Sequence, residues 1–280
     1  MLIKRLHSFK EYQRHRLLMA PEYRYRQEKE KALQESMNGA FQVAGFSYPA
    51  GERVKFLADF VYSDGKSVNW RERVVCPKTG LNNRQRAAVH IMDIELGVIP
   101  QESVYITEQV TALYKFLVVK HPRVIGSEFL GASIPRGSFD KKGVRNEDLT
   151  KLTFENDTFD AVLSFDCLEH MPDFVSGIKE VSRVVKPGGR LMWSVPFRTD
   201  LEFNLQRASL DPKGRIIHHE QPEYHGDPIS SEGCLCFTHF GWEMLEQVKN
   251  AGFKKAYALA YWSDIFGYLG GEQFLFVAQK

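Results

Sequence analysis

The amino-acid sequence predicts an α/β protein built on a mostly parallel sheet with helices on both faces. Between residues 103 and 197, extended apolar runs alternate with helical segments, which is the rhythm of strand, helix and parallel strand. From residue 242 to residue 279 the pattern is helix, strand, loop, strand. Residues 40–88 instead carry short alternating runs separated by turn sequences, which predict a small β-rich region. With 280 residues, 43% of them hydrophobic, the chain can bury such cores.

Each element of the sheet has its own signal. The helix expected over 174–185 is the best marked, because Asp173 is a suitable N-cap, Phe174, Ile178 and Val181 recur on one face, and a Pro-Gly-Gly turn follows. In chain order we predict strands at 104–107, 123–129, 159–165 and 190–197, helices at 110–119 and 174–185, and finally a helix at 242–251 and strands at 255–262 and 272–279.

The first hundred residues predict two smaller parts before this sheet. Residues 1–39 are dense in Lys, Arg, Glu and Gln, and Glu22 to Gln34 predicts a helix that is either a docking arm or, as we favour, a solvated surface helix. Residues 40–99 predict the β-rich subdomain, closed by a helical pattern from Asn83 to Leu96. The main domain is then expected over 100–280.

Charge and cysteine usage exclude several classes of protein. A formal charge of +2 gives no strong field for nucleic acid. Four cysteines, at 76, 167, 234 and 236, form no CxxC pair, so we expect free thiols and a reducing, cytoplasmic environment. No stretch approaches about 18 apolar residues, and we therefore expect neither a transmembrane span nor a signal peptide, and no membrane partner.

One segment carries a resemblance to a known family. Residues 146–197 read NEDLTKLTFENDTFDAVLSFDCLEHMPDFVSGIKEVSRVVKPGGRLMWSVPF. An acidic residue before a turn, a strand beginning Phe-Asp, a Leu-Glu-His, a helix, a Pro-Gly-Gly turn and another strand follow in this order. The segment resembles the central half of class I S-adenosylmethionine-dependent methyltransferases. The resemblance implies a Rossmann-like, seven-stranded, mostly parallel sheet and S-adenosylmethionine as the cofactor.

The resemblance also implies which residues bind that cofactor. In such enzymes the residues matching Asp148 and Leu149 border the adenine, and the acid matching Glu128 holds the ribose hydroxyls. Ser164 and Asp166, at the end of the strand expected over 159–165, are further candidate contacts. The alternatives are that Asp148 only caps a turn and that Glu128 is a solvated loop residue.

The sequence departs from the family at the first turn after a strand. Family members carry glycines there, which let the backbone approach the methionine part of the cofactor. Here Glu108, Val110 and Ala112 stand at those positions. We expect their side chains to restrict access, although Glu108 could attract the positive groups of the cofactor and is therefore itself a candidate contact. The same loop disfavours a nicotinamide-dependent dehydrogenase.

A further resemblance concerns residues 76–80. Related methyltransferase-like proteins carry a small zinc module with a CPxCG knuckle, whereas this chain has Cys-Pro-Lys-Thr-Gly and no upstream cysteine. One thiolate cannot make a tetrahedral zinc site. We interpret the stretch as a metal-free remnant in which packing replaces the ion.

Two places could supply groups at the reacting end. The first follows the strand expected over 159–165, where Asp166, Glu169 and His170 lie, and His170 is either a general base or a structural residue. The second is the long connection after residue 197, where His225 and Asp227 could bind hydroxyls or take up a proton, or could only build turns. No histidine pair has helical spacing, so we expect no metal.

These observations predict methyl transfer to a small-molecule or saccharide-type acceptor. The alternative from another class is a non-catalytic binding module that keeps the fold and has lost the cofactor, which the missing glycines favour. Modification of a nucleic acid is disfavoured by the nearly neutral charge and by the absence of a base-stacking motif. The sequence leaves the oligomeric state open.

Overall fold

The computed structural model describes residues 2–35, 37, 39–226, 229 and 232–280. The chain forms two compact units. The first contains the opening strand, residues 10–98 and residues 259–275, and the second contains residues 7–9, 99–258 and 276–280. The sequence-based division assigned residues 259–275 to the main domain. They belong with the first unit because Trp262 and Leu269 join its hydrophobic core.

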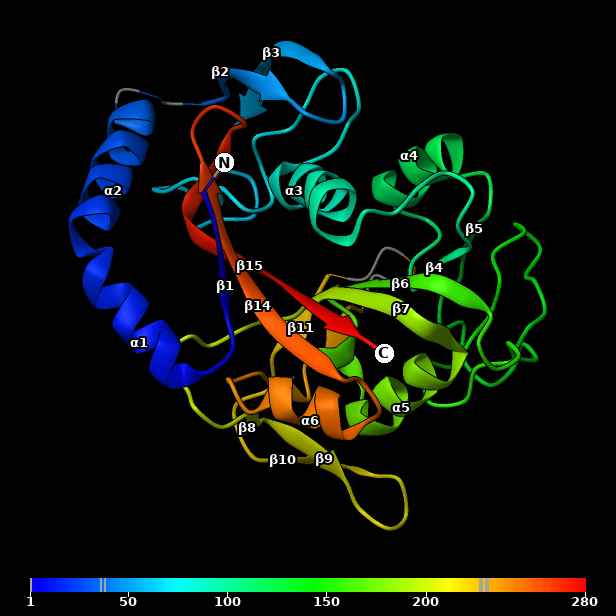
Figure 1. Ribbon diagram of the computed structural model, residues 1–280. Coiled ribbons are helices and arrows are strands. Elements are labelled where there is room, and N and C mark those ends of the chain that lie inside the picture. The colour runs from blue at the N-terminus through cyan, green and yellow to red at the C-terminus, as the bar shows by residue number, and fades with distance from the viewer. Residues whose placement is uncertain (1, 36, 38, 227–228, 230–231) are drawn as a thin grey trace. The chain divides into compact units, whose positions relative to one another are not determined.

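The predicted α/β fold with a seven-stranded, mostly parallel sheet is confirmed. The strand order is β1-β14-β15-β7-β6-β4-β5 (Figure 1). Strands β5, β4, β6 and β7 run parallel to their neighbours in this order, and β15 is antiparallel to β7. The bounds are Leu2–Leu6 for β1, Val104–Ile106 for β4, Val124–Gly126 for β5, Phe159–Phe165 for β6, Val185–Ser194 for β7, Lys255–Ser263 for β14 and Tyr268–Gln279 for β15.

The seventh strand corrects one expectation. Strand β1 lies in the stretch that we interpreted as a charged helical arm, whereas the other six strands overlap the predicted runs. Strand β7 begins earlier than expected, at Val185, and includes the Pro-Gly-Gly segment that we expected to be a turn. Lys4 and Arg5 of the five-residue strand β1 are exposed, and Leu6 after them is buried. The apolar residues of β1, at positions 2, 3 and 6, do not alternate with polar ones, so the strand has no clear period-two signal.

Helices cover the sheet of the second unit on opposite sides. Helix α4 (Ala112–Lys120) lies on one side, and α5 (Phe174–Val184) and α6 (Met244–Asn250) lie on the other (Figure 1). The predicted N-cap of α5 is confirmed, because a side-chain oxygen of Asp173 accepts a hydrogen bond from the backbone N–H of Ser176 at 3.0 Å. Phe174, Ile178 and Val181 are buried, as the apolar face predicted.

The long connection after β7 is folded into three two-stranded antiparallel ribbons. They pair β9 with β10, β11 with β12, and β8 with β13. The bounds are Leu205–Gln206 for β8, Ala208–Leu210 for β9, Ile216–His218 for β10, Tyr224–His225 for β11, Cys234–Leu235 for β12 and Thr238–His239 for β13. A single-turn helix, η2 (Leu168–His170), follows β6 and contacts β13.

The first unit has its own core around a hairpin. Strands β2 (Phe41–Ser47) and β3 (Glu52–Ala58) form an antiparallel hairpin in the region expected to be rich in β-structure. Helix α3 (Asn83–Ile91) continues into a π-turn, η1 (Met92–Leu96). The buried cluster comprises Phe41, Val43, Val54, Phe56, Ala58, Val68, Trp70, Val74, Cys76, Trp262 and Leu269.

Helices α1 (Phe9–Leu18) and α2 (Ala20–Gln34) correct the idea of a solvated surface helix. Arg26 and Glu30 of α2 are buried. Oε1 of Glu30 accepts hydrogen bonds from Trp262 Nε1 at 3.0 Å and from the backbone N–H groups of Gly270 and Gly271 at 2.8 and 3.1 Å. Charged composition concealed this packing, because buried charges with partners look in sequence like solvated ones.

The turn at residues 76–80 is a tight one. The N–H of Gly80 donates to the carbonyl of Cys76 at 2.9 Å, and Gly80 has a φ of +71°. The Cys76 side chain is buried in the core of the first unit, and its thiol is free. Its relation to a zinc knuckle stays a prediction.

Across the described ranges, no helix is both long and apolar enough to cross a membrane.

Candidate functional site

The candidate cofactor residues lie where β4, β5 and β6 end. Parallel strands present their carboxyl ends at one edge of the sheet, which is where open α/β sheets bind ligands. Glu128 follows β5, and it forms a parallel bridge with Asn146. Its backbone N–H donates to Arg145 at 2.9 Å, and its carbonyl accepts from Glu147 at 3.0 Å. The structure therefore brings the segment at 128 beside the segment that leads to Asp148.

Asp148 caps its own turn. Its Oδ1 accepts hydrogen bonds from the N–H of Thr150 at 2.9 Å and from the Thr150 hydroxyl at 2.6 Å. Asp148 is partly exposed, and Leu149 beside it is buried. Oδ1 of Asp148 therefore caps the turn, as one of the two alternatives proposed. The binding of an adenine by Asp148 and Leu149 stays a prediction.

The glycine-poor loop is tied to Glu128. Oε1 of Glu128 accepts from the backbone N–H groups of Gln109 and Val110 at 2.6 and 2.9 Å. The loop also approaches β5 closely, since a Cβ added to Gly126 would lie 2.8 Å from the carbonyl oxygen of Glu108. Thr111 then caps α4 by accepting from the N–H of Tyr114.

These contacts test how S-adenosylmethionine fits the site. The adenosine half needs hydrogen-bond acceptors for ribose hydroxyls and for an exocyclic amine. The carboxylates of Glu128, after β5, and of Asp148, in the turn after the bridge at Asn146, are such acceptors. The methionine half would meet a loop in which two N–H groups already bond Glu128, and in which Val110 carries a branched side chain. The residues present therefore fit the adenosine half of the cofactor better than the methionine half.

The end of β6 holds two further candidates in a strained turn. Ser164 is buried, and its hydroxyl accepts a hydrogen bond from Thr107 Oγ1 at 3.1 Å. Asp166 has a φ of +48°, a left-handed conformation that side chains other than glycine rarely adopt. The turn is fixed on both sides, because Asp166 donates its N–H to the Ser194 carbonyl and accepts from the Ser194 hydroxyl, each at 2.9 Å. Strained residues held in this way are common at functional sites.

His170 lies at the end of η2, directly beyond this turn. Its Nδ1 lies 2.9 Å from the carbonyl oxygen of Leu235 in β12, so Nδ1 carries the hydrogen and donates it. Its Nε2 points toward Glu169 and lies 3.7 Å from Oε1. Glu169 is fully buried, and burial raises the pKa of its carboxyl group.

His225 joins the same cluster from the connection after β7. Its ring lies 5.0 Å from that of His170, in an edge-to-face arrangement. Its Nδ1 is 3.6 Å from Oε1 of Glu169, and its Nε2 is 3.0 Å from Oε1 of Glu223. The nearby Cys236 thiol and Glu169 carboxylate raise the pKa of His225 to about 11, against the lowering by burial. The structure thus brings together His170 and His225. Asp227 lies outside the described residues.

Sequence reasoning missed the other members of this cluster. Glu223, Cys236 and His239 come from the ribbons of the connection, and Nε2 of His239 lies 3.2 Å from the Glu223 carboxylate. Arg207 also contacts Glu223, at 3.2 Å. A sequence signal existed in the alternate positions 223 and 225 around β11, whose side chains point to one face of a strand. The face of β11 that meets η2 depends on how the short β11–β12 ribbon pairs, which the sequence does not reveal.

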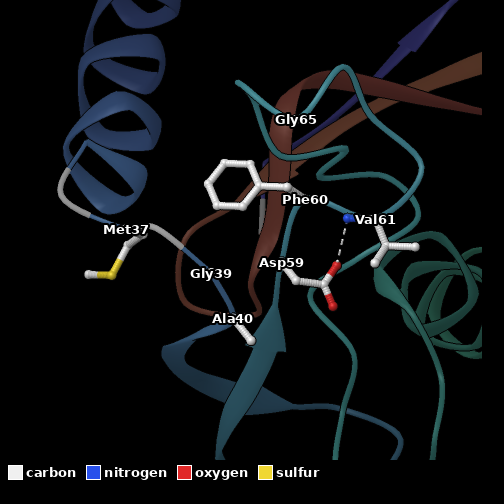
Figure 2. A pocket seen from close by; sticks show the side chains of 7 residues that line it. All are labelled: Met37, Gly39, Ala40, Asp59, Phe60, Val61 and Gly65. Carbon is white, nitrogen blue, oxygen red and sulfur yellow. Dashed lines mark hydrogen bonds between the residues drawn. The ribbon is translucent and has the colours of Figure 1, made fainter.

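A separate pocket lies in the first unit. Figure 2 shows it beside Asp59, whose Oδ1 accepts from the N–H of Val61 at 3.0 Å. Both carboxylate oxygens of Asp59 are also bound by Arg73, which lowers the pKa of Asp59. The residues that line the pocket are Met37, Gly39, Ala40, Asp59, Phe60, Val61 and Gly65. None of them belongs to the predicted site, so this pocket carries no functional assignment.

Comparison with known proteins finds a similarity to one family in the central part of the second unit. The profile of the methyltransferase domain family matches residues 117–193, which run from α4 to the end of β7. This stretch of the chain is similar to methyltransferase domains. The match covers Glu128, Asp148, Asp166 and His170, and ends before the connection that holds His225.

Curated relatives match a part of the chain. A demethylmenaquinone methyltransferase of Streptomyces avermitilis is 39% identical over 85 residues, which are 28% of this chain and 36% of that protein. A 27-O-demethylrifamycin SV methyltransferase of Amycolatopsis mediterranei is 30% identical over 106 residues, 34% of this chain and 39% of that protein. The chain therefore spans less than half the length of either relative.

Solved structures are similar over a longer stretch. An S-adenosylmethionine-dependent methyltransferase of Mesorhizobium loti covers 70% of this chain and 97% of its own, with 16% identity and a TM-score of 0.40.

Proposed function

We propose that this protein transfers the methyl group of S-adenosylmethionine to a hydroxyl of a small-molecule or saccharide-type acceptor. The observation that supports the proposal most is the position of Glu128. Its carboxylate stands at the end of β5, its backbone is bonded to the segment that leads to Asp148, and both residues lie within the matched domain. The carboxylates of these two residues suit ribose hydroxyls and an exocyclic amine.

Methyl transfer asks little of the protein beyond alignment. The bound cofactor supplies a methyl group on a positively charged sulfur, and the chain's residues bind and orient the two partners. The acceptor hydroxyl has to lose a proton. His170 is placed for this step, because its Nδ1 donates to Leu235 and its Nε2 is consequently an acceptor. His225 faces the same ring and would position the acceptor beside it.

Similarity to methyltransferases of small organic molecules supports a small organic acceptor. The two curated relatives are named for a demethylated quinone and a demethylated rifamycin. The connection after β7 adds polar groups rather than a basic surface, and the chain's formal charge of +2 offers little attraction to nucleic acid. We therefore place an uncharged hydroxyl compound at the end of β6.

Calorimetric titration with S-adenosylmethionine tests the proposal. We expect micromolar binding that weakens at least tenfold in Asp148→Asn, because the amide keeps an oxygen for Thr150 but presents a donor where adenine also presents one. Asp211→Asn is the matched control, since Asp211 also caps a turn, through Lys213 and Arg215, away from these strand ends. Absence of binding at millimolar ligand to the folded protein contradicts the proposal.

A non-catalytic binding module is the second candidate, and the loop after β4 favours it. Its N–H groups at 109 and 110 bond Glu128, and Glu108, Val110 and Ala112 replace glycines. Such a module would bind adenosine as tightly as S-adenosylmethionine, because the methionine half would add nothing. Titration with adenosine under the same conditions separates the two candidates.

A further inference from the structure

We propose that Glu169, His170 and His225 bind a divalent transition-metal ion, with Zn²⁺ the best match to two imidazoles and one carboxylate. The three side chains each offer one ligand atom, and these atoms all lie within 4.8 Å of one another. Two histidines and a glutamate form a known protein zinc-binding set, which leaves a coordination position for water or a ligand. The inference does not depend on cofactor binding.

The separations between the ligand atoms favour an ion over direct hydrogen bonds. Oε1 of Glu169 lies 3.7 Å from Nε2 of His170 and 3.6 Å from Nδ1 of His225. Nitrogen–oxygen hydrogen bonds are about 2.7 to 3.2 Å long. Two ligands of one tetrahedral zinc ion, each about 2.0 to 2.1 Å from the metal, stand roughly 3.4 Å apart. The observed spacing is closer to that of ligands around a shared ion.

Glu169 supplies a second, independent observation. Its side chain is fully buried, and within the described parts of the chain neither carboxylate oxygen has a hydrogen-bond partner. A buried carboxylate without hydrogen bonds costs several kcal/mol, roughly, unless a counter-charge compensates it. A divalent ion on Oε1 would provide that charge. It would also explain why this carboxylate faces two ring nitrogens.

Each histidine is held through its other nitrogen, as metal-binding histidines are. His170 donates from Nδ1 to the Leu235 carbonyl at 2.9 Å, and Nε2 of His225 lies 3.0 Å from the Glu223 carboxylate. Such contacts fix the tautomer and aim the remaining nitrogen at the metal. Glu223 itself is already balanced by Arg207 and His239, so we assign it an orienting role.

The ion would act at the acceptor end of the site. The side chains of His170 and His225 are 19% and 27% exposed, so solvent can reach the position between them. An oxygen bound to the ion loses its proton more readily. With the ion bound, Nε2 of His170 would be a ligand and not a base. The acceptor hydroxyl, bound to the ion, would then lose its proton to solvent water, which reaches the position between the two histidines.

Cobalt titration of the chelator-treated full chain, without S-adenosylmethionine, tests the site. We expect one Co²⁺ per chain, visible d–d absorption typical of nitrogen and oxygen ligands at low coordination number, and displacement of Co²⁺ by Zn²⁺. Glu169→Gln and His225→Gln should weaken binding at least 100-fold, and Glu223→Gln about 10- to 100-fold. His218→Gln is the matched control, since His218 is an exposed histidine of the same connection.

Circular dichroism establishes that each variant is folded. If Glu169→Gln does not fold, His170→Gln carries the test, because its side chain is partly exposed. The proposal is overturned if the folded native chain shows no d–d absorption at millimolar Co²⁺, or if binding survives in the ligand variants and disappears in His218→Gln. Because no cofactor is present, these results stand whether or not S-adenosylmethionine binds.

Discussion

The carboxylate of Glu128 accepts a hydrogen bond from the backbone N–H of Val110, at 2.9 Å. This bond joins the end of β5 to the loop after β4, where the methyltransferase family carries glycines. The loop is therefore held by the same side chain that we propose for the ribose. Cofactor binding and loop conformation are expected to depend on each other.

Removing side chains from this loop should strengthen cofactor binding. In Glu108→Gly/Val110→Gly the backbone can approach the methionine half of the ligand, and we expect roughly 3- to 10-fold tighter binding of S-adenosylmethionine, about 1 kcal/mol. Binding of adenosine, which has no methionine half, should be unchanged. Val110→Ala separates the size of the side chain from added backbone flexibility. Equal affinities of all three proteins for S-adenosylmethionine would show that the loop does not restrict the site.

Asp166 should tolerate glycine better than alanine. At a φ of +48° alanine keeps the backbone strain and loses the hydrogen bond from Ser194, whereas glycine loses the bond but relieves the strain. We expect Asp166→Gly to be more stable than Asp166→Ala by about 1 kcal/mol in urea unfolding. The reverse order would indicate that residue 166 is not held in the left-handed region.

Asp160 should make the protein sensitive to strong acid. Burial alone raises the pKa of Asp160, but hydrogen bonds from Lys186 and Ser103 outweigh it and hold the pKa at about 2, below the ordinary value of 3.8. A carboxyl group with a lowered pKa contributes stability above about pH 4, and this contribution is lost as the pH falls through 2. Asp160→Asn should lose about 1 to 2 kcal/mol at pH 7 and show a flatter decline between pH 4 and pH 2. Parallel acid-unfolding curves for the two proteins would contradict this.

Glu30 should be needed for the stability of the first unit. Replacing it with alanine leaves three donors, Trp262 Nε1 and the N–H groups of Gly270 and Gly271, without their acceptor. We expect Glu30→Ala to lower the free energy of unfolding by roughly 2 to 4 kcal/mol. Glu28→Ala, on the exposed side of the same helix, is the control and should change it by less than about 0.5 kcal/mol. A loss as small as that of Glu28→Ala would show that Glu30 is not buried against residues 262–271. Chemical unfolding followed by tryptophan fluorescence measures both.

Local patterns were sufficient to predict most of the sheet. Strand β6 has the bounds that its apolar run predicted, and α5 begins after Asp173, because an N-cap and a buried face are local signals. The apolar residues of strand β1 do not alternate with polar ones, so this strand showed no period of two. The side chains of Arg26 and Glu30 were interpreted as solvated because composition does not reveal the partners of a charge.

The sequence by itself determined the α/β class, the methyltransferase resemblance and the acidic residues at the strand ends. Only the tertiary structure decided that His225 reaches Glu169 and His170, and that Glu223 holds its other nitrogen. The physical reason is the distance along the chain over which each interaction acts. Helix and strand signals act between neighbours in the chain, whereas this cluster depends on how short ribbons far along the chain pack against the turn after β6.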